Sequence, residues 1–133
     1  MKKPCIIIVE AELAIRQPVS DYLRECGYRV IEAVNTDEAV ELVEKSGVEI
    51  DIVLADAAST GVLGGFGLAK WIKSKKPEID VVLAGSVQKV AEQAGELCAE
   101  GPQLARPYHH ETLHDKIKAL LGARARHNPP DSC

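Results

Sequence analysis

The stretch Cys5-Ile6-Ile7-Ile8-Val9-Glu10 is a short apolar run that stops abruptly at an acidic residue. An unbroken β-branched run of this length predicts a strand that is buried on both faces, as the strands of a parallel sheet are. Further strands are predicted at residues 28–33, 51–55 and 81–84, with a weaker fifth strand at residues 103–105. The chain is therefore expected to build a sheet with helices on both of its sides.

The segments between these strands carry apolar residues at helical spacing. The first has Gly27 as its C-terminal cap and contains Pro18, which predicts either a late start or a kink in the helix. In the second, Thr36 is the expected N-terminal cap. The remaining helices are expected from Leu68 to just before Pro77 and over residues 87–98, and a last helix carries Leu113 and Ile117 on its core face and stops at Gly122. Five β-α units in this order predict a doubly wound α/β fold with a parallel sheet.

The chain has 133 residues, of which 46% are hydrophobic, and its net charge is -4. This length corresponds to one domain, which we place at residues 1–122, followed by a flexible tail over residues 123–133. Lysine and arginine are scattered rather than gathered into a stripe, so nucleic acid is not an expected partner. No apolar run reaches the roughly 18 residues of a membrane span, so a cytoplasmic protein without a membrane partner is expected.

The four cysteines, Cys5, Cys26, Cys98 and Cys133, are far apart and form no Cys-x-x-Cys pair. We expect all of them to be reduced thiols, with the first three packed as small hydrophobic residues. Cys133 lies in a polar segment and is the one expected to oxidise between molecules. The spacing predicts neither a zinc knuckle nor a redox motif.

Charged residues follow the ends of three predicted strands. Glu10, with Glu12 nearby, follows the first strand, Asp56 follows the third, and Arg106 follows the fifth. In an open α/β sheet such strand ends meet at one edge, near the point where the strand order reverses. Carboxylates that share this edge suit Mg²⁺, which takes oxygen ligands. An aspartate beside a metal ion and a basic side chain is suited to accept a phosphoryl group.

Four segments carry a resemblance to a known family: residues 6–12 (IIIVEAE), 22–30 (YLRECGYRV), 51–56 (DIVLAD) and 106–108 (RPY). They are similar to the receiver domain of bacterial response regulators, the phosphoacceptor module of two-component signalling. The resemblance implies a flavodoxin-like (βα)5 sheet with strand order 2-1-3-4-5, and Asp56 as the phosphoacceptor. It also implies a sensor histidine kinase or a histidine phosphotransferase as partner, and it leaves a homodimer open. The only reaction implied is phosphoryl transfer to Asp56 itself, so a classical enzyme is not expected.

The metal site departs from the family's pattern at one position. The resemblance assigns the Mg²⁺ ligands to Glu10, Glu12, Asp56 and the backbone carbonyl of Ala58. The family usually has two adjacent acids after the first strand, and here Ala11 stands in the second place. Because alanine cannot bind a metal ion, a weakened Mg²⁺ site is expected.

The groups that contact and report the phosphoryl group also depart from the pattern. Ala84 replaces the Thr or Ser after the fourth strand, Arg106 replaces a lysine, and Gln103 stands in place of the switch aromatic. We therefore expect weak phosphorylation of Asp56 and signalling through docking of a downstream protein in trans. The alternative is a pseudo-receiver, an adaptor that works without phosphorylation.

Two motifs indicate other classes of protein. His110-Glu111-Thr112-Leu113-His114 satisfies the His-Glu-x-x-His pattern, in which two imidazoles one helical turn apart bind zinc, so a metalloprotease-like protein is a remote alternative. The glycine-rich loop at residues 61–67 matches neither nucleotide-binding pattern and is better explained by turn-forming glycines. A flavin site is a further alternative on this fold, disfavoured because the loops lack an aromatic residue to stack on the ring.

Overall fold

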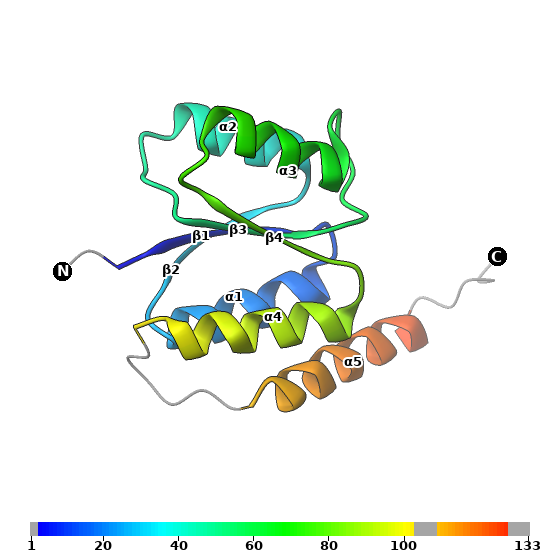
Figure 1. The fold of residues 1–133 in the computed structure, drawn as a ribbon. Helices are drawn as coiled ribbons and strands as arrows, with labels where there is room; N and C mark the ends of the chain where they lie inside the picture. Colours follow the sequence, from blue (N-terminus) through cyan, green and yellow to red (C-terminus); the bar gives the residue numbers. More distant parts are fainter. Residues whose placement is uncertain (1–2, 103–108, 128–133) are drawn as a thin grey trace.

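The structure is a computed structural model that describes residues 3–102 and 109–127. Within this part of the chain, four parallel strands form one sheet in the order β2-β1-β3-β4, with helices on both faces (Figure 1). The strands are β1 (Cys5–Val9), β2 (Arg29–Ala33), β3 (Ile52–Asp56) and β4 (Asp80–Ala84). The helices are α1 (Leu13–Glu25), α2 (Thr36–Lys45), α3 (Gly64–Lys75), α4 (Val87–Glu100) and α5 (His110–His127). The α/β class and the order of these four strands are confirmed, whereas the expected fifth strand at residues 103–105 lies outside the described residues.

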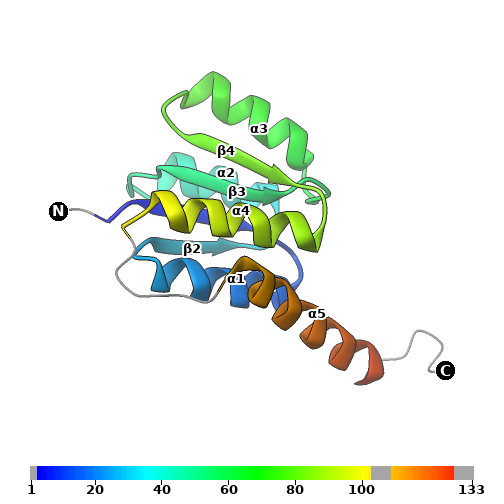
Figure 2. The ribbon, with the colours of Figure 1, turned by 60° about the horizontal axis from the view of Figure 1, so that its bottom comes forward.

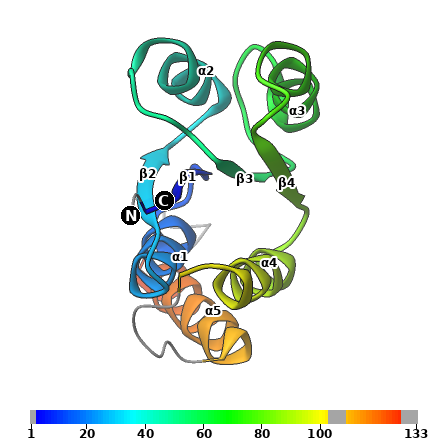
Figure 3. The same cartoon turned by 60° about the vertical axis from the view of Figure 1, so that its left-hand side comes forward.

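β1 divides the hydrophobic core in two, because its side chains alternate between the faces of the sheet. Ile6 and Ile8 pack with residues of α1, α4 and α5. Cys5, Ile7 and Val9 pack with residues of α2 and α3. Figure 3 shows the sheet between these two helical layers. Every residue of β1 is therefore buried, as its unbroken apolar sequence predicts.

The predicted N-terminal cap of α2 is wrong by one residue. Asn35 is the cap, and its side-chain oxygen accepts a hydrogen bond from the Glu38 backbone N–H at 2.9 Å. Thr36 is instead the first helical residue, and its buried hydroxyl donates to the Thr60 carbonyl at 3.1 Å. Thr36 thereby ties the start of α2 to the loop that follows β3.

The ends of two other helices also differ from the predictions. α3 begins at Gly64 rather than Leu68, so the end of the glycine-rich loop is helical despite the low helix propensity of glycine. α5 continues past Gly122 to His127, and this end of the helix projects beyond the layered part of the molecule (Figure 2). Over residues 3–102 and 109–127, no helix has the length and apolar character needed to cross a membrane.

Pro18 lies inside α1, five residues after the helix begins at Leu13. The late start that Pro18 suggested is therefore wrong. Proline has no N–H to donate to the Ala14 carbonyl, so one main-chain hydrogen bond of this helix cannot form. Val19 and Leu23 pack with Ile6 and Ile8 of β1 and hold α1 on the sheet. Pro18 is also buried, and it lines a pocket together with Lys116 and Leu120 of α5.

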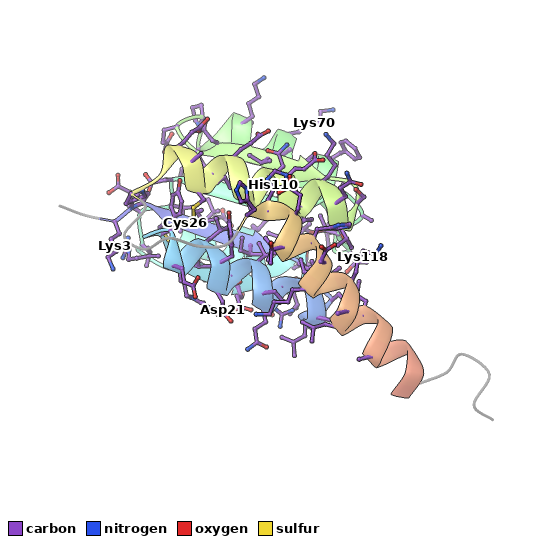
Figure 4. The ribbon with its side chains drawn as sticks, turned by 90° about the horizontal axis from the view of Figure 1, so that it is seen from below. Lys3, Asp21, Cys26, Lys70, His110 and Lys118 are labelled. Carbon is purple, nitrogen blue, oxygen red and sulfur yellow. A yellow bond between two sulfur atoms is a disulfide. The ribbon has the colours of Figure 1, made fainter. Side chains whose placement is uncertain are left out.

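Cys26 and Cys98 form a disulfide bond, so the prediction that both are reduced thiols is wrong. Cys26, which is labelled in Figure 4, ends α1. Cys98 lies in the last turn of α4, and the two Cα atoms are 5.3 Å apart. The two cysteines are 72 residues apart in the sequence and meet because α4 packs beside α1. Cys5 is free and buried, as predicted, whereas Cys133 lies outside the described residues.

Candidate functional site

The predicted site lies where β1, β3 and β4 end, at the same edge of the sheet. β1 leads directly into Glu10, β3 ends with Asp56, and β4 ends with Ala84. Asp56 and Ala84 are paired across β3 and β4, and the Ala57 N–H donates to the Ala84 carbonyl at 2.9 Å. β1 is also paired with β3, and Glu10 and Asp56 line one small cavity together with Val90 of α4. The structure thus brings Glu10 and Asp56 together, as the topology predicts.

Glu10 is an acid in a buried position, with only 6% of its surface exposed. Its Oε2 atom accepts a hydrogen bond from the Glu12 backbone N–H at 2.9 Å. Burial, and second the negative charge of Asp56, raise the pKa of Glu10 from 4.5 to about 7, while the nearby Arg16 guanidinium lowers it. Near neutral pH this carboxyl group is therefore divided between its protonated and ionised forms.

Asp56 is partly exposed at the end of β3. Its Oδ1 atom accepts a hydrogen bond from the Ala58 N–H at 3.0 Å. Its backbone carbonyl accepts two more from Ser59, one from the N–H at 3.0 Å and one from the hydroxyl at 2.6 Å. These bonds orient both the carboxylate and the turn that follows it. An accessible carboxylate with a fixed orientation is suited to act as a nucleophile.

The structure places a basic residue, Arg16, beside this site, and sequence reasoning missed it. Its guanidinium donates to the Glu10 carbonyl oxygen at 2.9 Å and to Glu32 Oε1 at 2.9 Å. The basic residue predicted for the site, Arg106, lies outside the described residues. The available signal was the position of Arg16 one helical turn after Glu12, because side chains in a first turn lean back toward the strand that precedes the helix.

A hydroxyl group is missing at the end of β4. The Ala84 side chain is buried, with 1% of the residue exposed. Ser86, two residues later, is the N-terminal cap of α4, and its hydroxyl oxygen accepts a hydrogen bond from the Lys89 N–H at 3.1 Å. Because this hydroxyl is used to cap the helix, Ser86 does not replace the Thr or Ser that the family has at position 84.

The oxygen atoms at this edge fit a hard divalent cation. Burial, and second the negative charge of Asp56, disfavour the ionised form of Glu10, and a cation between the two carboxyl groups would offset both effects. Mg²⁺ often binds through only one or two carboxylates and keeps several water ligands. In the described residues no three His, Cys, Asp or Glu side chains form a metal-binding group, so Glu12 does not join the other two acids in such a cluster. The roles of Glu12 and of the Ala58 carbonyl as ligands stay predictions.

Gly65 supports the turn behind Asp56, and Gly65→Ala is expected to lower the free energy of unfolding by about 2 kcal/mol. A Cβ at this position would lie 2.6 Å from the Ala57 carbonyl oxygen and 2.9 Å from the Asp56 carbonyl oxygen, so the turn or α3 would have to shift. Urea denaturation measures the loss. Gly85→Ala is the matched control because nothing lies within 4 Å of its added Cβ, and an equal loss in both variants would contradict the steric explanation.

The His-Glu-x-x-His motif lies at the start of α5 and does not form a zinc site. His110 Nε2 lies 3.3 Å from Glu111 within the motif itself, and His114 Nδ1 lies 3.9 Å from Asp115. The His110 side chain packs against Gly95 of α4, where an added Cβ would come within 2.8 Å of it. Since the part of the chain that the structure describes offers no group of three metal-binding side chains, the metalloprotease alternative is not favoured.

The chain matches a known protein family and several curated proteins. A family model described as "Response regulator receiver domain" matches residues 6–118. A cyclic di-GMP phosphodiesterase of Thermotoga maritima is 32% identical over 124 residues, and the regulatory protein VanR of Enterococcus faecium is 28% identical over 116 residues. These matches cover 92% and 87% of this chain but only 32% and 49% of the two relatives. The chain thus spans less than half the length of either relative.

Solved structures show the same architecture. The chemotaxis response regulator CheY4 of Vibrio cholerae has a TM-score of 0.57 and 25% sequence identity, with 90% of this chain and 99% of that chain covered. The non-phosphorylated HemR receiver domain of Leptospira biflexa has a TM-score of 0.56 and 22% identity, with 90% and 94% covered. The similarity to the HemR receiver domain shows a shared fold only.

Proposed function

The chain belongs to the response-regulator receiver family, and from this membership we propose that Asp56 accepts a phosphoryl group in a two-component phosphorelay. One observation supports the proposal most strongly. Asp56 is partly exposed at the end of β3, oriented by the Ala58 N–H, and lies beside the buried carboxyl group of Glu10. Receiver domains interact with sensor histidine kinases and with downstream effectors. We propose a sensor histidine kinase or a histidine phosphotransferase as the donor and a separate protein as the downstream target.

In the proposed reaction an Asp56 carboxylate oxygen attacks the phosphorus atom of a phosphohistidine. A P–O bond forms, the P–N bond breaks, and its electron pair stays on the imidazole nitrogen. The hydrogen bond from Ala58 to Oδ1 keeps the carboxylate in one orientation for this attack. Mg²⁺ held by Glu10 and Asp56 would neutralise charge on the transferred oxygens. Arg106 is proposed to contact one of those oxygens, as a lysine does in the family.

We expect this reaction to be slow. Ala11 supplies no second carboxylate to the metal site, and Ala84 supplies no hydroxyl to the phosphoryl group. The loss of one such contact commonly lowers a rate by on the order of a hundredfold. These two alanines also favour the second candidate function, an adaptor that docks its partner without phosphorylation.

Incubation with a small-molecule phosphodonor and Mg²⁺, followed by intact-mass measurement, tests the proposal. The wild type should gain one phosphoryl group, and Asp56→Asn should lose this labelling completely because an amide cannot act as the nucleophile. Asp80→Asn is the control, because Asp80 is an exposed aspartate where β4 begins, at the opposite edge of the sheet. Label that persists in Asp56→Asn would contradict Asp56 as the acceptor. A wild type that stays unlabelled after prolonged incubation would favour the adaptor function.

A further inference from the structure

α4 connects the candidate site with the Cys26–Cys98 disulfide. At its start, Ser86 caps the helix, and Val90 lines the cavity that Glu10 and Asp56 also line. In its last turn, Cys98 is bonded to the residue that ends α1. A single helix of 14 residues therefore contacts the site with its first turns and carries the disulfide in its last.

We propose that Cys26 and Cys98 form a reversible thiol–disulfide site in the folded protein, and that its reduction removes the covalent link between the last turn of α4 and α1, so that this turn loosens. The co-reactant is a dithiol. One thiolate of the dithiol attacks a sulfur of the pair, the S–S bond breaks, and a mixed disulfide forms. The second thiol of the dithiol then displaces the protein sulfur. Two electrons pass to the protein, which gains two thiols, and the dithiol becomes a disulfide.

Both cysteines lie at helix ends, where opening is least costly. Cys26 is completely buried and Cys98 is 5% exposed, so a dithiol reaches the bond only after a local opening. α4 ends at Glu100, two residues after Cys98. Fraying of this last turn exposes the Cys98 sulfur without disturbing the sheet, because helix ends open at a much smaller cost than the whole domain. We therefore place the first attack at Cys98.

Beside the disulfide, Ala94 and Leu97 of this end of α4 pack in the core cluster, and Gly95 lies against His110 of α5. The Tyr28 hydroxyl donates a hydrogen bond at 2.5 Å to the carbonyl of Leu97, the residue before Cys98. Burial, and second the charge of Glu100, raise the pKa of Tyr28, so the hydroxyl keeps its proton and the hydrogen bond persists in neutral solution. After reduction this bond and the apolar packing of Leu97 remain, so α4 loosens at its end rather than detaching.

The hydrophobic core is expected to keep the domain folded when the disulfide is reduced. The two clusters on either side of β1 supply a hydrophobic core that includes all four described strands. A domain of this length buries about two-thirds of the surface of its unfolded chain without any cross-link. Reduction should therefore leave the sheet folded. This result would distinguish a reversible redox site from a disulfide whose only role is to keep the protein folded.

The test uses the full chain with Cys133→Ser, which leaves Cys5 as the only other thiol. The protein is equilibrated with dithiothreitol and its oxidised form at graded ratios, the thiols are alkylated, and the labels are counted by intact mass. Two labels should appear together without denaturant. Amide hydrogen exchange at residues 94–101 should then be at least about tenfold faster, while exchange in β1 and β3 stays unchanged, and oxidised dithiothreitol should restore the slow exchange.

Variants distinguish the proposal from general destabilisation. Cys26→Ala combined with Cys98→Ala should reproduce the exchange pattern of the reduced wild type, whereas Cys5→Ala should keep the pattern of the oxidised one. A bond that is reduced only in denaturant would overturn the proposal. So would reduction that accelerates exchange equally in β1, or reduction that leaves residues 94–101 unchanged.

A second readout rests on the proposed function. Because α4 also contacts the cavity behind Asp56, the rate of Asp56 labelling by a phosphodonor should differ at least about threefold between the two redox states. If neither state is labelled, the proposed phosphorylation fails, while the exchange measurement still decides the redox proposal. If both states are labelled at the same rate, the disulfide does not communicate with the site.

Discussion

Replacing Glu10 by glutamine is expected to raise the free energy of unfolding by about 3 kcal/mol at slightly alkaline pH. The pKa of Glu10 is about 7 in the folded protein, whereas a glutamate in an unfolded chain has a pKa of 4.5. Above neutral pH the folded wild type therefore holds an ionised carboxylate that is buried and faces Asp56. Glutamine removes this charge, has nearly the same shape, and keeps an oxygen that can accept the hydrogen bond from the Glu12 N–H.

The effect of this substitution should depend on pH in a defined direction. Between 4.5 and about 7 the folded protein holds a proton that the unfolded chain has released, so the stability of the wild type falls as the pH rises. Below this interval both states are protonated, and the wild type and Glu10→Gln should be equally stable. Above about pH 7 the folded wild type carries the full cost of the buried, ionised Glu10 carboxylate. Urea denaturation across this pH range measures the difference.

A matched control and a metal titration sharpen the result. Glu96→Gln, at an exposed position on α4, should change the stability by less than about 0.5 kcal/mol at every pH. Saturating Mg²⁺ should stabilise the wild type more than Glu10→Gln, because a cation favours the ionised carboxylate. A pH dependence that survives in Glu10→Gln would contradict the assignment of that dependence to Glu10.

Ala11→Asp is expected to accelerate phosphorylation of Asp56 by on the order of a hundredfold at a fixed, subsaturating Mg²⁺ concentration. The substitution supplies the second acid that the family places after the first strand. Ala11 is exposed, so an aspartate fits there without repacking the core. Intact-mass measurement of labelling against time gives the rate, and the same incubation without Mg²⁺ gives the background.

The stability of Ala11→Asp should show the metal dependence directly. Without Mg²⁺ at slightly alkaline pH, the new carboxylate adds a negative charge directly after the ionised Glu10, so the variant should be less stable than the wild type. With Mg²⁺ this loss should be reversed. Ala119→Asp, on an exposed alanine of α5, should change neither the labelling rate nor the response to Mg²⁺. Equal labelling rates for Ala11→Asp and the wild type would show that the missing acid does not limit the reaction.

Burial was the part of the fold that the sequence predicted best. The run at β1 requires cover on both faces, and this requirement alone indicates a parallel sheet between two layers of helices. Helix boundaries were less predictable, because neighbouring residues have similar capping ability. Asn35 and Thr36 are both suitable N-terminal caps. Which of them caps α2 depends on the Thr60 carbonyl, 24 residues away in the sequence, because this carbonyl accepts a hydrogen bond from the Thr36 hydroxyl.

The site was predicted in part for a similar reason. Strand ends of a parallel sheet meet at one edge, so the proximity of Glu10 and Asp56 follows from topology. No such rule predicts the disulfide, because its two cysteines lie on different helices and meet only through the packing of α4 beside α1. Arg16 was also missed. Its position one helical turn after Glu12 indicates only that it lies near the end of β1, whereas its partners, the Glu10 carbonyl and Glu32 of β2, are known only from the structure.

The alternating side chains of β1 determine how the domain loses its structure. Ile6 and Ile8 belong to one cluster, and Cys5, Ile7 and Val9 belong to the other, so neither helical layer has a strand of its own at the centre of the sheet. Separation of either layer would expose half of the side chains of β1 to water, and the strand would then lose the burial that also holds the opposite layer. The two layers are thus energetically coupled through five residues, and unfolding of one layer brings about unfolding of the other.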